Sequence, residues 1–285
     1  MKASLFVLST VFLASFAFAD SPQGVWHTKI GNVEFYCIQD ASSEANSSVL
    51  LTDDKDALAR LAPTGKTPSG CTVFVVKKGT DTVLIDTGIG RQSLERLQTI
   101  GIKPEDVKHI LLTHSHGDHV GGLVKDGRRV FPNAAVWLDE RELAFWKSAR
   151  NKDFCEQVLK LYGEPKFLTP DEKTSVIFPE CVTVDLAGHT PGHVGFLISG
   201  GGRKLFVVGD MLHNGAVQFA RPDISIQYDS DPKEAADVRH RALKRAAEEK
   251  LLLAATHLAF PPVGEVTIDR AGFRFIPLET PAHAR

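Results

Sequence analysis

Residues 113–122 have the sequence THSHGDHVGG, which places three histidines and one aspartate within six positions. They follow the apolar run ILL, which predicts a buried strand that ends at this point. Because alternate residues of a strand lie on the same side, His114 and His116 are expected to point in one direction. The turn that follows can bring Asp118 and His119 toward a second point, and the glycines of the stretch permit the backbone angles that such a loop needs.

The residue types of this stretch indicate a metal site. Imidazole nitrogen and carboxylate oxygen are ligands of zinc and of neighbouring divalent transition metals. The alternative interpretation is a solvated loop that happens to be rich in histidine. Four potential ligands directly after a buried strand argue against that alternative, so the stretch predicts metal binding.

Three further donors stand where other predicted strands meet loops, the place where α/β sheets usually present functional groups. His189 lies in the sequence GHTPGH, after the strand run Val182–Ala187. Asp210 ends a predicted hairpin, and His257 follows the strand run Leu251–Ala255. Singly, each could be a surface, core or turn residue. Together with the first cluster, they supply enough ligands for a second metal.

Two apolar hairpins predict a repeated architecture. The first pairs Cys71–Val76 with Thr82–Ile85, the second pairs Val194–Ser199 with Lys204–Val208, and each ends at an aspartate beside a glycine. Helical segments follow these hairpins: Arg91–Ile100, Glu140–Arg150, Asp153–Tyr162 and Pro232–Lys250. This order predicts an α/β fold in which two packed sheets have helices outside, a four-layer αβ/βα sandwich. We expect one domain from residue 20 to residue 285.

The segment Pro232–Lys250 carries the clearest helix signals. Asp231 suits the N-cap, Pro232 the first helical position, and Glu234 completes a capping-box pattern. The apolar residues fall near one stripe, which predicts the buried face: Ala235, Val238, Ala242, Leu243, Ala246 and Ala247.

The charge balance excludes one class of partner. The 285 residues include 33 basic and 35 acidic side chains, for a formal net charge of −2. Such a balance gives no field that attracts phosphate, so nucleic acid is not an expected partner. A small molecule is the expected substrate.

The N-terminus predicts export. Lys2 precedes the almost wholly apolar run Leu5–Phe18, and Ala17-Phe18-Ala19 forms a small-x-small cleavage pattern. The run is shorter than the ~20 residues needed to span a bilayer. Residues 1–19 are therefore predicted to be a secretory signal peptide rather than an anchor, which leaves a periplasmic or secreted chain that does not contact the membrane. Export makes disulfides possible, in any of three pairings, among four cysteines: Cys37, Cys71, Cys155 and Cys181.

The pattern HxHxDH, followed in order by three more donors, resembles the ligand set of the metallo-β-lactamase superfamily. This resemblance covers essentially the whole mature chain, and it implies the four-layer sandwich with a dinuclear centre at one edge of the sheets. It implies one metal held by His114, His116 and His189. It implies a second metal held by Asp118, His119 and His257, with Asp210 bridging both. Zinc is the first expectation for the two divalent ions, and manganese, iron and cobalt are the alternatives.

Such a centre predicts hydrolysis. Two divalent ions can lower the pKa of water so that a bridging hydroxide forms at neutral pH, polarise a C=O or P=O group, and neutralise the leaving oxygen. No serine or cysteine nucleophile is required. Asp210 and Asp118 are the predicted catalytic carboxylates, Asp210 as the bridge and Asp118 in proton transfer.

Supporting residues are expected around the ligands. Asp86 ends the first hairpin, as Asp210 ends the second, and can orient one of the first histidines, since metal-bound histidines usually donate their other N–H to a carboxylate or carbonyl. His193, in the same GHTPGH sequence as His189, and His213, three residues after Asp210, are further candidates for supporting the ligands. Phe219 and Phe260 stand close in sequence to proposed ligands and are candidates for an apolar leaving-group pocket, although aromatic residues are more often core.

Within the superfamily, the chain is most similar to the methyl parathion hydrolase group of exported bacterial enzymes. The similarity extends over several stretches: 186–193, 209–213, 216–219, 226–231 and 257–261. That group implies hydrolysis of phosphotriesters, aryl esters or lactones, and often a homodimer.

Other members of the superfamily give the alternatives. True β-lactamases carry Cys, or lack a bridging carboxylate, where this chain has Asp210. Acyl-homoserine lactonases typically carry Tyr three residues after the bridging aspartate, where this chain has His213. A β-lactamase, an acyl-homoserine lactonase and a non-catalytic metal-binding protein remain the alternatives to a hydrolase of small esters, lactones or phosphotriesters.

Overall fold

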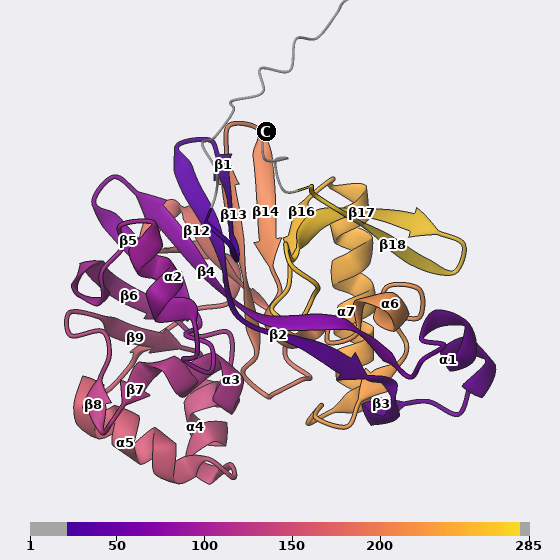
Figure 1. The fold of residues 1–285 in the computed structure, drawn as a ribbon, viewed down its shortest axis with the longest axis horizontal. Coiled ribbons are helices and arrows are strands. Elements are labelled where there is room, and N and C mark those ends of the chain that lie inside the picture. The colour runs from indigo at the N-terminus through magenta and orange to yellow at the C-terminus, as the bar shows by residue number, and fades with distance from the viewer. Residues whose placement is uncertain (1–21, 280–285) are drawn as a thin grey trace, which may run out of the picture.

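Two seven-stranded mixed sheets form the centre of the molecule in the computed structural model, which describes residues 22–279 (Figure 1). The predicted signal peptide lies outside the described residues. The first sheet has, in spatial order, the strands β1 (Val25–Ile30), β2 (Val33–Asn46), β4 (Lys66–Lys78), β5 (Asp81–Ile85), β6 (Val107–Leu111), β9 (Ala135–Leu138) and β10 (Lys166–Phe167). The second has β11 (Asp171–Val176), β12 (Phe178–Asp185), β13 (Val194–Gly200), β14 (Arg203–Val207), β16 (Leu252–Ala254), β17 (Val263–Asp269) and β18 (Gly272–Pro277).

Period-two alternation along the strands builds the core between the sheets. In β4, Phe74 and Val76 pack between the sheets, whereas Val73 and Val75 face the helices outside. The same alternation occurs in the second sheet, where β13 and β14 contribute Phe196 and Val207 among others to the central layer. Each of these fully buried side chains contributes about 1.5–3 kcal/mol through burial of apolar surface.

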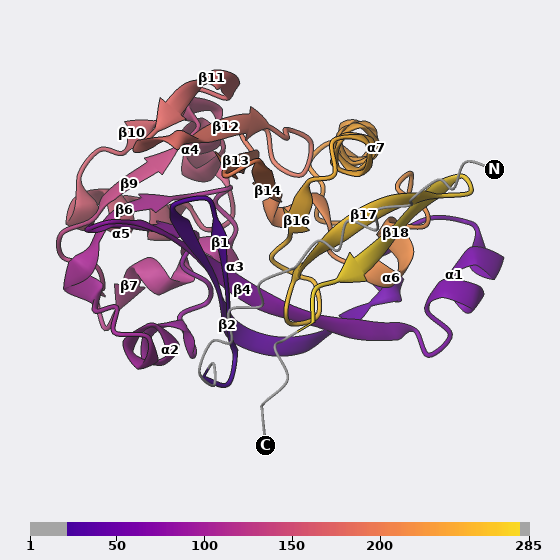
Figure 2. The ribbon, with the colours of Figure 1, turned by 90° about the horizontal axis from the view of Figure 1, so that it is seen from above.

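Helices cover the two outer faces, which completes four layers (Figure 2). Helices α2 (Ser93–Thr99), α4 (Glu140–Ser148) and α5 (Lys152–Tyr162) pack on the first sheet, and α7 (Pro232–Glu248) packs on the second. The short helices are α1 (Lys55–Leu61), α3 (Gly117–Val120) and α6 (Gly215–Gln218). The predicted four-layer αβ/βα sandwich is confirmed.

The predicted repeat is also present. In each half, an antiparallel hairpin is followed by a parallel neighbour: β4 and β5 then β6, and β13 and β14 then β16. Asp86 directly follows the last residue of the first hairpin, and Asp210 lies in the turn three residues after the second. The two aspartates therefore occupy corresponding positions in the two sheets.

Helix α7 follows the sequence prediction with one correction. Asp231 caps it by accepting from the N–H of Glu234, and the predicted apolar stripe is buried apart from Ala247, which is partly buried. The buried face also includes Arg239, a charged residue outside the predicted apolar stripe. Its guanidinium donates to the carbonyls of Met211, Pro222 and Ile224, which offsets the cost of burying a charge.

Strands β2 and β4 form a long antiparallel ribbon that continues past the sandwich as far as the pair Asn46 and Lys66. Figure 1 shows this ribbon running toward α1 and β3 (Leu50–Leu51), which pairs with β15 (Ser225–Ile226). A bulge at Asp40 interrupts the ribbon, and the Asp40 carboxylate accepts five backbone N–H groups of the loop 89–93 that leads into α2. This bonding explains why α2 begins two residues later than predicted.

The four cysteines form no disulfide. Cys37, Cys71, Cys155 and Cys181 are all buried and free, so none of the three pairings considered from the sequence is present. Within the described part of the chain, no helix is both long and apolar enough to cross a membrane.

Candidate metal centre

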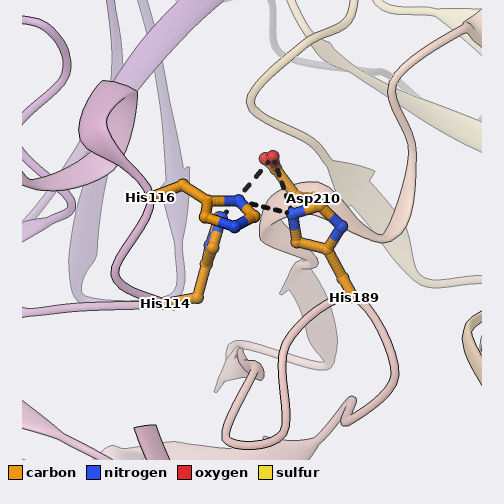
Figure 3. Close-up of side chains that lie close together, drawn as sticks. All are labelled: His114, His116, His189 and Asp210. Atoms are coloured by element: carbon orange, nitrogen blue, oxygen red, sulfur yellow. Dashed lines mark hydrogen bonds and ion pairs between the residues drawn. The ribbon is translucent and has the colours of Figure 1, made fainter. Parts of the chain in front are cut away.

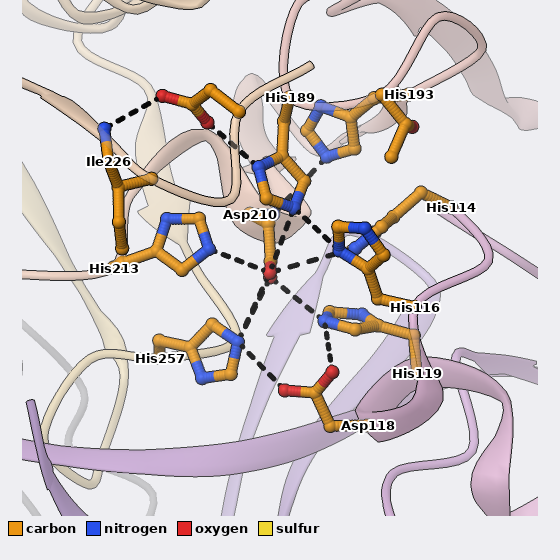
Figure 4. Close-up of polar contacts among 12 residues, drawn as sticks. His114, His116, Asp118, His119, His189, His193, Asp210, His213, Ile226 and His257 are labelled. Atoms are coloured by element: carbon orange, nitrogen blue, oxygen red, sulfur yellow. Dashed lines mark hydrogen bonds and ion pairs between the residues drawn. The ribbon is translucent and has the colours of Figure 1, made fainter. Parts of the chain in front are cut away.

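The predicted donors converge at one edge of the sandwich, where strands from both sheets end (Figure 4). The loop after β6, which runs into α3, carries the four donors of the HxHxDH pattern. His189 comes from the loop after β12, Asp210 from the turn after β14, and His257 from the loop after β16. The order and register of the strands in the two sheets bring these four segments together at one edge.

The donor atoms fall into groups small enough to surround an ion. His114, His116, His189 and Asp210 have ligand atoms within 4.8 Å of one another (Figure 3). A second group within the same limit contains Asp118, His119 and His257, and a third contains Asp210, His213 and His257. Asp210 belongs to the first group and the third, and His257 belongs to the second and the third. Asp210 therefore connects the donors of the first group with His257.

Asp210 lies at the centre of these contacts and is almost wholly buried. Its Oδ1 is 2.9 Å from His119 Nε2 and 3.2 Å from His257 Nε2. Its Oδ2 is 2.9 Å from His213 Nε2 and 3.5–3.6 Å from the Nε2 atoms of His189 and His114. One carboxylate thus faces imidazoles of both groups.

The residues fit the two metal ions that the fold implies, as their unsatisfied polar atoms show. Among the described residues, His114 Nε2 is buried without a hydrogen-bond partner, and His119 Nε2 and Asp210 Oδ1 are buried 2.9 Å apart without hydrogen-bond geometry between them. His189 Nε2 and His116 Nδ1 face each other at 2.9 Å. Buried polar atoms without partners are costly and rare, and a shared cation is the partner that nitrogen lone pairs and a carboxylate oxygen accept together.

Three of the histidines are held by their far ring nitrogens. His119 Nδ1 lies 2.7 Å from Asp86 Oδ2, His189 Nδ1 lies 2.8 Å from Asp229 Oδ1, and His257 Nδ1 lies 2.8 Å from the Gly70 carbonyl. Each acceptor favours a proton on Nδ1, which leaves the Nε2 lone pair directed into the cluster.

Asp86 has the orienting contact that the sequence predicted. Besides His119, it accepts from the backbone N–H and the hydroxyl of Thr113, both at 2.8 Å. Asp86 adopts a left-handed backbone conformation with φ of 60°, which aspartate tolerates better than most residues. The turn at the end of β5 is therefore shaped to place this carboxylate behind His119.

His193 and His213 also contact Asp210, but in different ways. His193 donates through Nδ1 to the Leu186 carbonyl, and its Nε2 accepts from the Asp210 backbone N–H at 3.2 Å. Both its ring nitrogens are thus occupied by the chain. His213 directs Nε2 at the Asp210 carboxylate and stacks on His257, with ring centroids 5.2 Å apart.

Burial and the carboxylates pull the histidine pKa values in opposite directions. Burial lowers the pKa of His114 well below its usual value and that of His189 to about 3, so both imidazoles are neutral. Burial also opposes protonation of His257, but Asp210 and Asp118 outweigh it and raise its pKa to about 10. The pKa of His119 is raised for the same reason, with Asp210 as the largest raising influence.

Sequence reasoning missed the role of Asp229. It stands 40 positions from His189, in a stretch noted only for its similarity to a family. Its Oδ2 accepts from the Ile226 N–H at 3.0 Å and lies 3.7 Å from Arg239 Nη2. An aspartate in a loop carries no signal of this contact, since only the tertiary fold brings it to the histidine.

A cavity of about 880 Å³ opens over the cluster. Six of the side chains that contact or form the donor groups line its floor: His116, Asp118, His189, Asp210, His213 and His257. Its walls come from other segments and are largely apolar: Ala45, Val49, Leu50, Phe145, Ala149, Ile226 and Tyr228. The volume matches a site for a small organic ligand.

Phe219 and Phe260 do not line this cavity, which corrects the pocket prediction. Phe219 is buried in the core under α7, stacked on Phe275 with ring centroids 5.0 Å apart, and borders a separate hollow of about 440 Å³. Phe260 is partly buried and packs against the core between the sheets. Nearness in sequence to Asp210 and His257 did not fix the direction in which these rings point.

Known proteins share this fold. Residues 67–257 match the model of the metallo-beta-lactamase superfamily. The crystal structure of hydrolase AbOPH in the beta lactamase superfamily superimposes with a TM-score of 0.81 and 27% identity, over 90% of this chain and 98% of that one. AidC, a dizinc quorum-quenching lactonase in complex with a product N-hexanoyl-L-homoserine, superimposes with a TM-score of 0.81 and 25% identity, over 91% and 99% of the two chains.

Curated relatives match over shorter segments. The uncharacterized protein YobT of Bacillus subtilis is 31% identical over 136 residues, which are 46% of this chain and 57% of YobT. A hydroxyacylglutathione hydrolase of Tolumonas auensis is 25% identical over 143 residues, 50% of this chain and 47% of that enzyme. The chain thus spans about half the length of these two relatives. With the superfamily model matching well over half of its residues, and with two mixed sheets flanked by helices, the chain belongs to the metallo-beta-lactamase superfamily.

Proposed function

We propose that this protein is a metal-dependent hydrolase that uses two divalent ions, zinc foremost. His114, His116 and His189 hold one ion, and Asp118, His119 and His257 hold the other. Asp210 is shared between them. The observation that carries this proposal is the placement of Asp210, whose two oxygens face imidazoles of both donor groups at 2.9–3.6 Å.

In the proposed reaction, the metal ions and the protein side chains have separate roles. When bound, the ions supply Lewis acidity that polarises an ester carbonyl or phosphoryl oxygen and lowers the pKa of water. The Asp118 side chain is about one-third exposed at the cavity floor, with Oδ2 3.3 Å from His257 Nε2. Asp118 is therefore placed to accept a proton at a carboxylate oxygen from the attacking water. Asp86 and Asp229 hold the rings of His119 and His189 in fixed orientations.

The cavity favours a small substrate with an apolar group. Val49, Leu50 and Ile226 form an apolar wall, and Phe145 lies on another segment of the wall with its ring centroid 6.4 Å from that of His116. We propose esters, lactones or phosphotriesters, as in the methyl parathion hydrolase group that the sequence resembles. Among these three substrate classes, the structural similarity to AidC, a dizinc lactonase, supports lactones in particular.

Turnover of a substrate panel by purified protein loaded with zinc or manganese tests this proposal. The panel contains p-nitrophenyl esters, lactones including N-acyl homoserine lactones, paraoxon-like triesters and β-lactams. We expect turnover of at least one of the first three classes, lost on chelation and restored by added metal. Preference for β-lactams makes the protein a β-lactamase. Two bound metals with no turnover make it a metal-binding protein, and failure to bind metal refutes the centre itself.

We also propose that the protein acts in the periplasm or outside the cell, and that it can form a homodimer. The first statement rests on the predicted signal peptide of residues 1–19, and the second on the family resemblance alone. N-terminal sequencing of protein recovered from the extracytoplasmic fraction should begin at Asp20. Sedimentation of the mature protein gives its oligomeric state.

A further inference from the structure

Glu142 is a fully buried carboxylate that belongs to none of the donor groups. It lies in the first turn of α4, and no cationic side chain pairs with it among residues 22–279. A buried carboxylate without a cation is costly unless hydrogen bonds replace its hydration. Glu142 has four such bonds, so its environment is built to hold a carboxylate.

The four bonds come from two loops that both carry metal donors. Oε1 accepts from the backbone N–H of Ser115 at 2.8 Å and from its hydroxyl at 2.5 Å. Oε2 accepts from the Thr190 hydroxyl at 2.7 Å and from the Gly192 N–H at 3.1 Å. Ser115 separates His114 from His116, and Thr190 directly follows His189. One side chain therefore joins the donor loop of the first sheet to that of the second.

Close packing keeps this connection rigid. A Cβ added to Gly192 would lie 2.3 Å from the Glu142 backbone nitrogen, so the loop after β12 approaches α4 as closely as only glycine permits. On the other side, Asn151 donates from Nδ2 to the Ser115 carbonyl at 2.8 Å. The backbone at Ser115 is thus fixed by side chains on both sides of its peptide.

The four hydrogen-bond donors around Glu142 fit a carboxylate better than an amide. The two hydroxyls can turn, but the N–H groups of Ser115 and Gly192 can only donate, and each one faces a different oxygen of Glu142. Glutamine offers one oxygen and one NH₂ group. In a Glu142→Gln variant, the NH₂ must oppose one of the two N–H groups, so one loop loses its backbone hydrogen bond whichever way the amide is turned and keeps only the contact of its hydroxyl.

We infer that Glu142 is a positioning residue for the dinuclear centre, which sets the distance between the His114 and His116 side chains and that of His189. This inference rests on the proposed function, because it assumes that these histidines share an ion. The geometry that supports it lies entirely in the chain's own hydrogen bonds. Loss of the connection should therefore weaken metal binding more than it weakens the fold.

Metal retention in the full chain tests the inference. Wild type, Glu142→Gln and the control Glu140→Gln are loaded with zinc and dialysed against increasing chelator, and retained zinc is measured by atomic absorption. Glu140 lies in the same helical turn but is exposed. We expect Glu142→Gln to lose its zinc at a chelator concentration at least about tenfold lower than wild type does. Removal of residues that orient metal ligands weakens metal affinity by a factor of this size. Glu140→Gln should behave as wild type.

Thermal unfolding separates positioning from a merely structural role. A structural role lowers the unfolding temperatures of the metal-free and zinc-loaded forms equally. A positioning role reduces the rise in unfolding temperature that zinc produces. A Glu142→Gln variant that retains zinc as wild type does overturns the inference. Failure of wild type itself to bind zinc refutes the proposed function instead.

A second pair of variants decides the matter if Glu142→Gln does not fold. Thr190→Val removes one of the four donors with little change in shape, and Thr190→Ser keeps the hydroxyl. We expect Thr190→Val to lose zinc more readily than Thr190→Ser, by a smaller factor than the tenfold expected above. Equal zinc retention by the two variants overturns the inference.

Discussion

Asp229 Oδ1 lies 2.8 Å from Nδ1 of His189, and both side chains are buried. Arg239 of α7 lies on the other side of Asp229, with Nη2 3.7 Å from Oδ2, and it also donates to the Met211 carbonyl next to Asp210. The orientations of two proposed metal ligands therefore depend on one buried guanidinium. This relationship connects the packing of α7 on the second sheet to the metal centre.

Replacement of Asp229 by Asn should weaken zinc binding. Asparagine can still face His189 with its oxygen, but its NH₂ group then opposes the Ile226 N–H that Asp229 Oδ2 accepts. We expect a 10–100-fold loss in zinc affinity, measured by competition with a chelating dye. Asp223→Asn is the control, since Asp223 is exposed and pairs only with Arg221 among the described residues. Equal affinities of the two variants would show that His189 needs no orienting carboxylate.

Replacement of Asp210 by Ala should abolish hydrolysis and lower the metal content. Among the described residues, Asp210 is the one carboxylate that faces histidines of both proposed ion sites, and its removal leaves buried imidazoles without their shared partner. Metal per chain is measured by atomic absorption alongside turnover of the best substrate of the panel. Full activity with two retained metals would refute the bridging role.

Phe219 and Phe145 should respond in opposite ways to replacement by Ala. Phe219 is in the core, so Phe219→Ala should cost about 3–5 kcal/mol of unfolding free energy, measured with urea, and leave substrate preference unchanged. Phe145 lines the cavity, so Phe145→Ala should shift relative kcat/KM across the panel with a smaller loss of stability. A change of substrate preference in Phe219→Ala alone would restore the original pocket assignment.

Metal loading at pH 7 should release protons. In the metal-free chain, carboxylates outweigh burial and raise the pKa of His257 to about 10, and that of His119 is raised as well. His257 is thus protonated at pH 7, and the raised pKa of His119 favours its protonated form, whereas a ligand must offer its lone pair, so metal affinity should increase with pH. Calorimetric titration of zinc in buffers of different ionisation enthalpy counts the released protons. His257→Gln should release fewer, and a heat independent of buffer would contradict the prediction.

The cysteines should be unreactive until the protein unfolds. All four are buried and free, and burial raises the pKa of Cys71 and of Cys181 to about 12, which disfavours the reactive thiolate. A colorimetric thiol reagent should detect almost none in the native protein and four in denaturant without reductant. Fewer than four under denaturing conditions would indicate a disulfide.

Local patterns in the sequence were sufficient to predict the sandwich and the positions of the donors. The hairpins before Asp86 and Asp210 are short, nearly continuous apolar runs joined by tight turns, and the HxHxDH stretch gathers its donors in one segment. Asp86 was also found, because it repeats the position of Asp210 in the other half. The hairpins and the HxHxDH stretch are local in sequence, and the contact of Asp86 with His119, 33 positions away, follows from where the two strand ends lie.

Residues whose role depends on distant partners could not be found in this way. Glu142 and Arg239 look like ordinary charged residues on helices, and only their burial shows that they hold loops together. Asp229 meets His189 across 40 positions of chain. The direction of Phe219 depends on the packing of β18 beside it, where Phe275 provides the stacking partner. The position of a residue in the sequence does not show which distant residues it contacts in the fold.

The long β2–β4 ribbon has a consequence for how this enzyme type diversifies. Its outer end supplies Glu44, Ala45, Asn46 and Ser69 to the cavity wall, while the ions' proposed ligands sit on other segments, at the strand ends of the sandwich. Mutations at Glu44, Ala45 and Asn46 can therefore reshape the rim without touching a proposed ligand, whereas Ser69 and its neighbour Gly70 also hold His257, through its carbonyl and its Nδ1. Selection for a new substrate has a separate, tolerant part of the architecture on which to act.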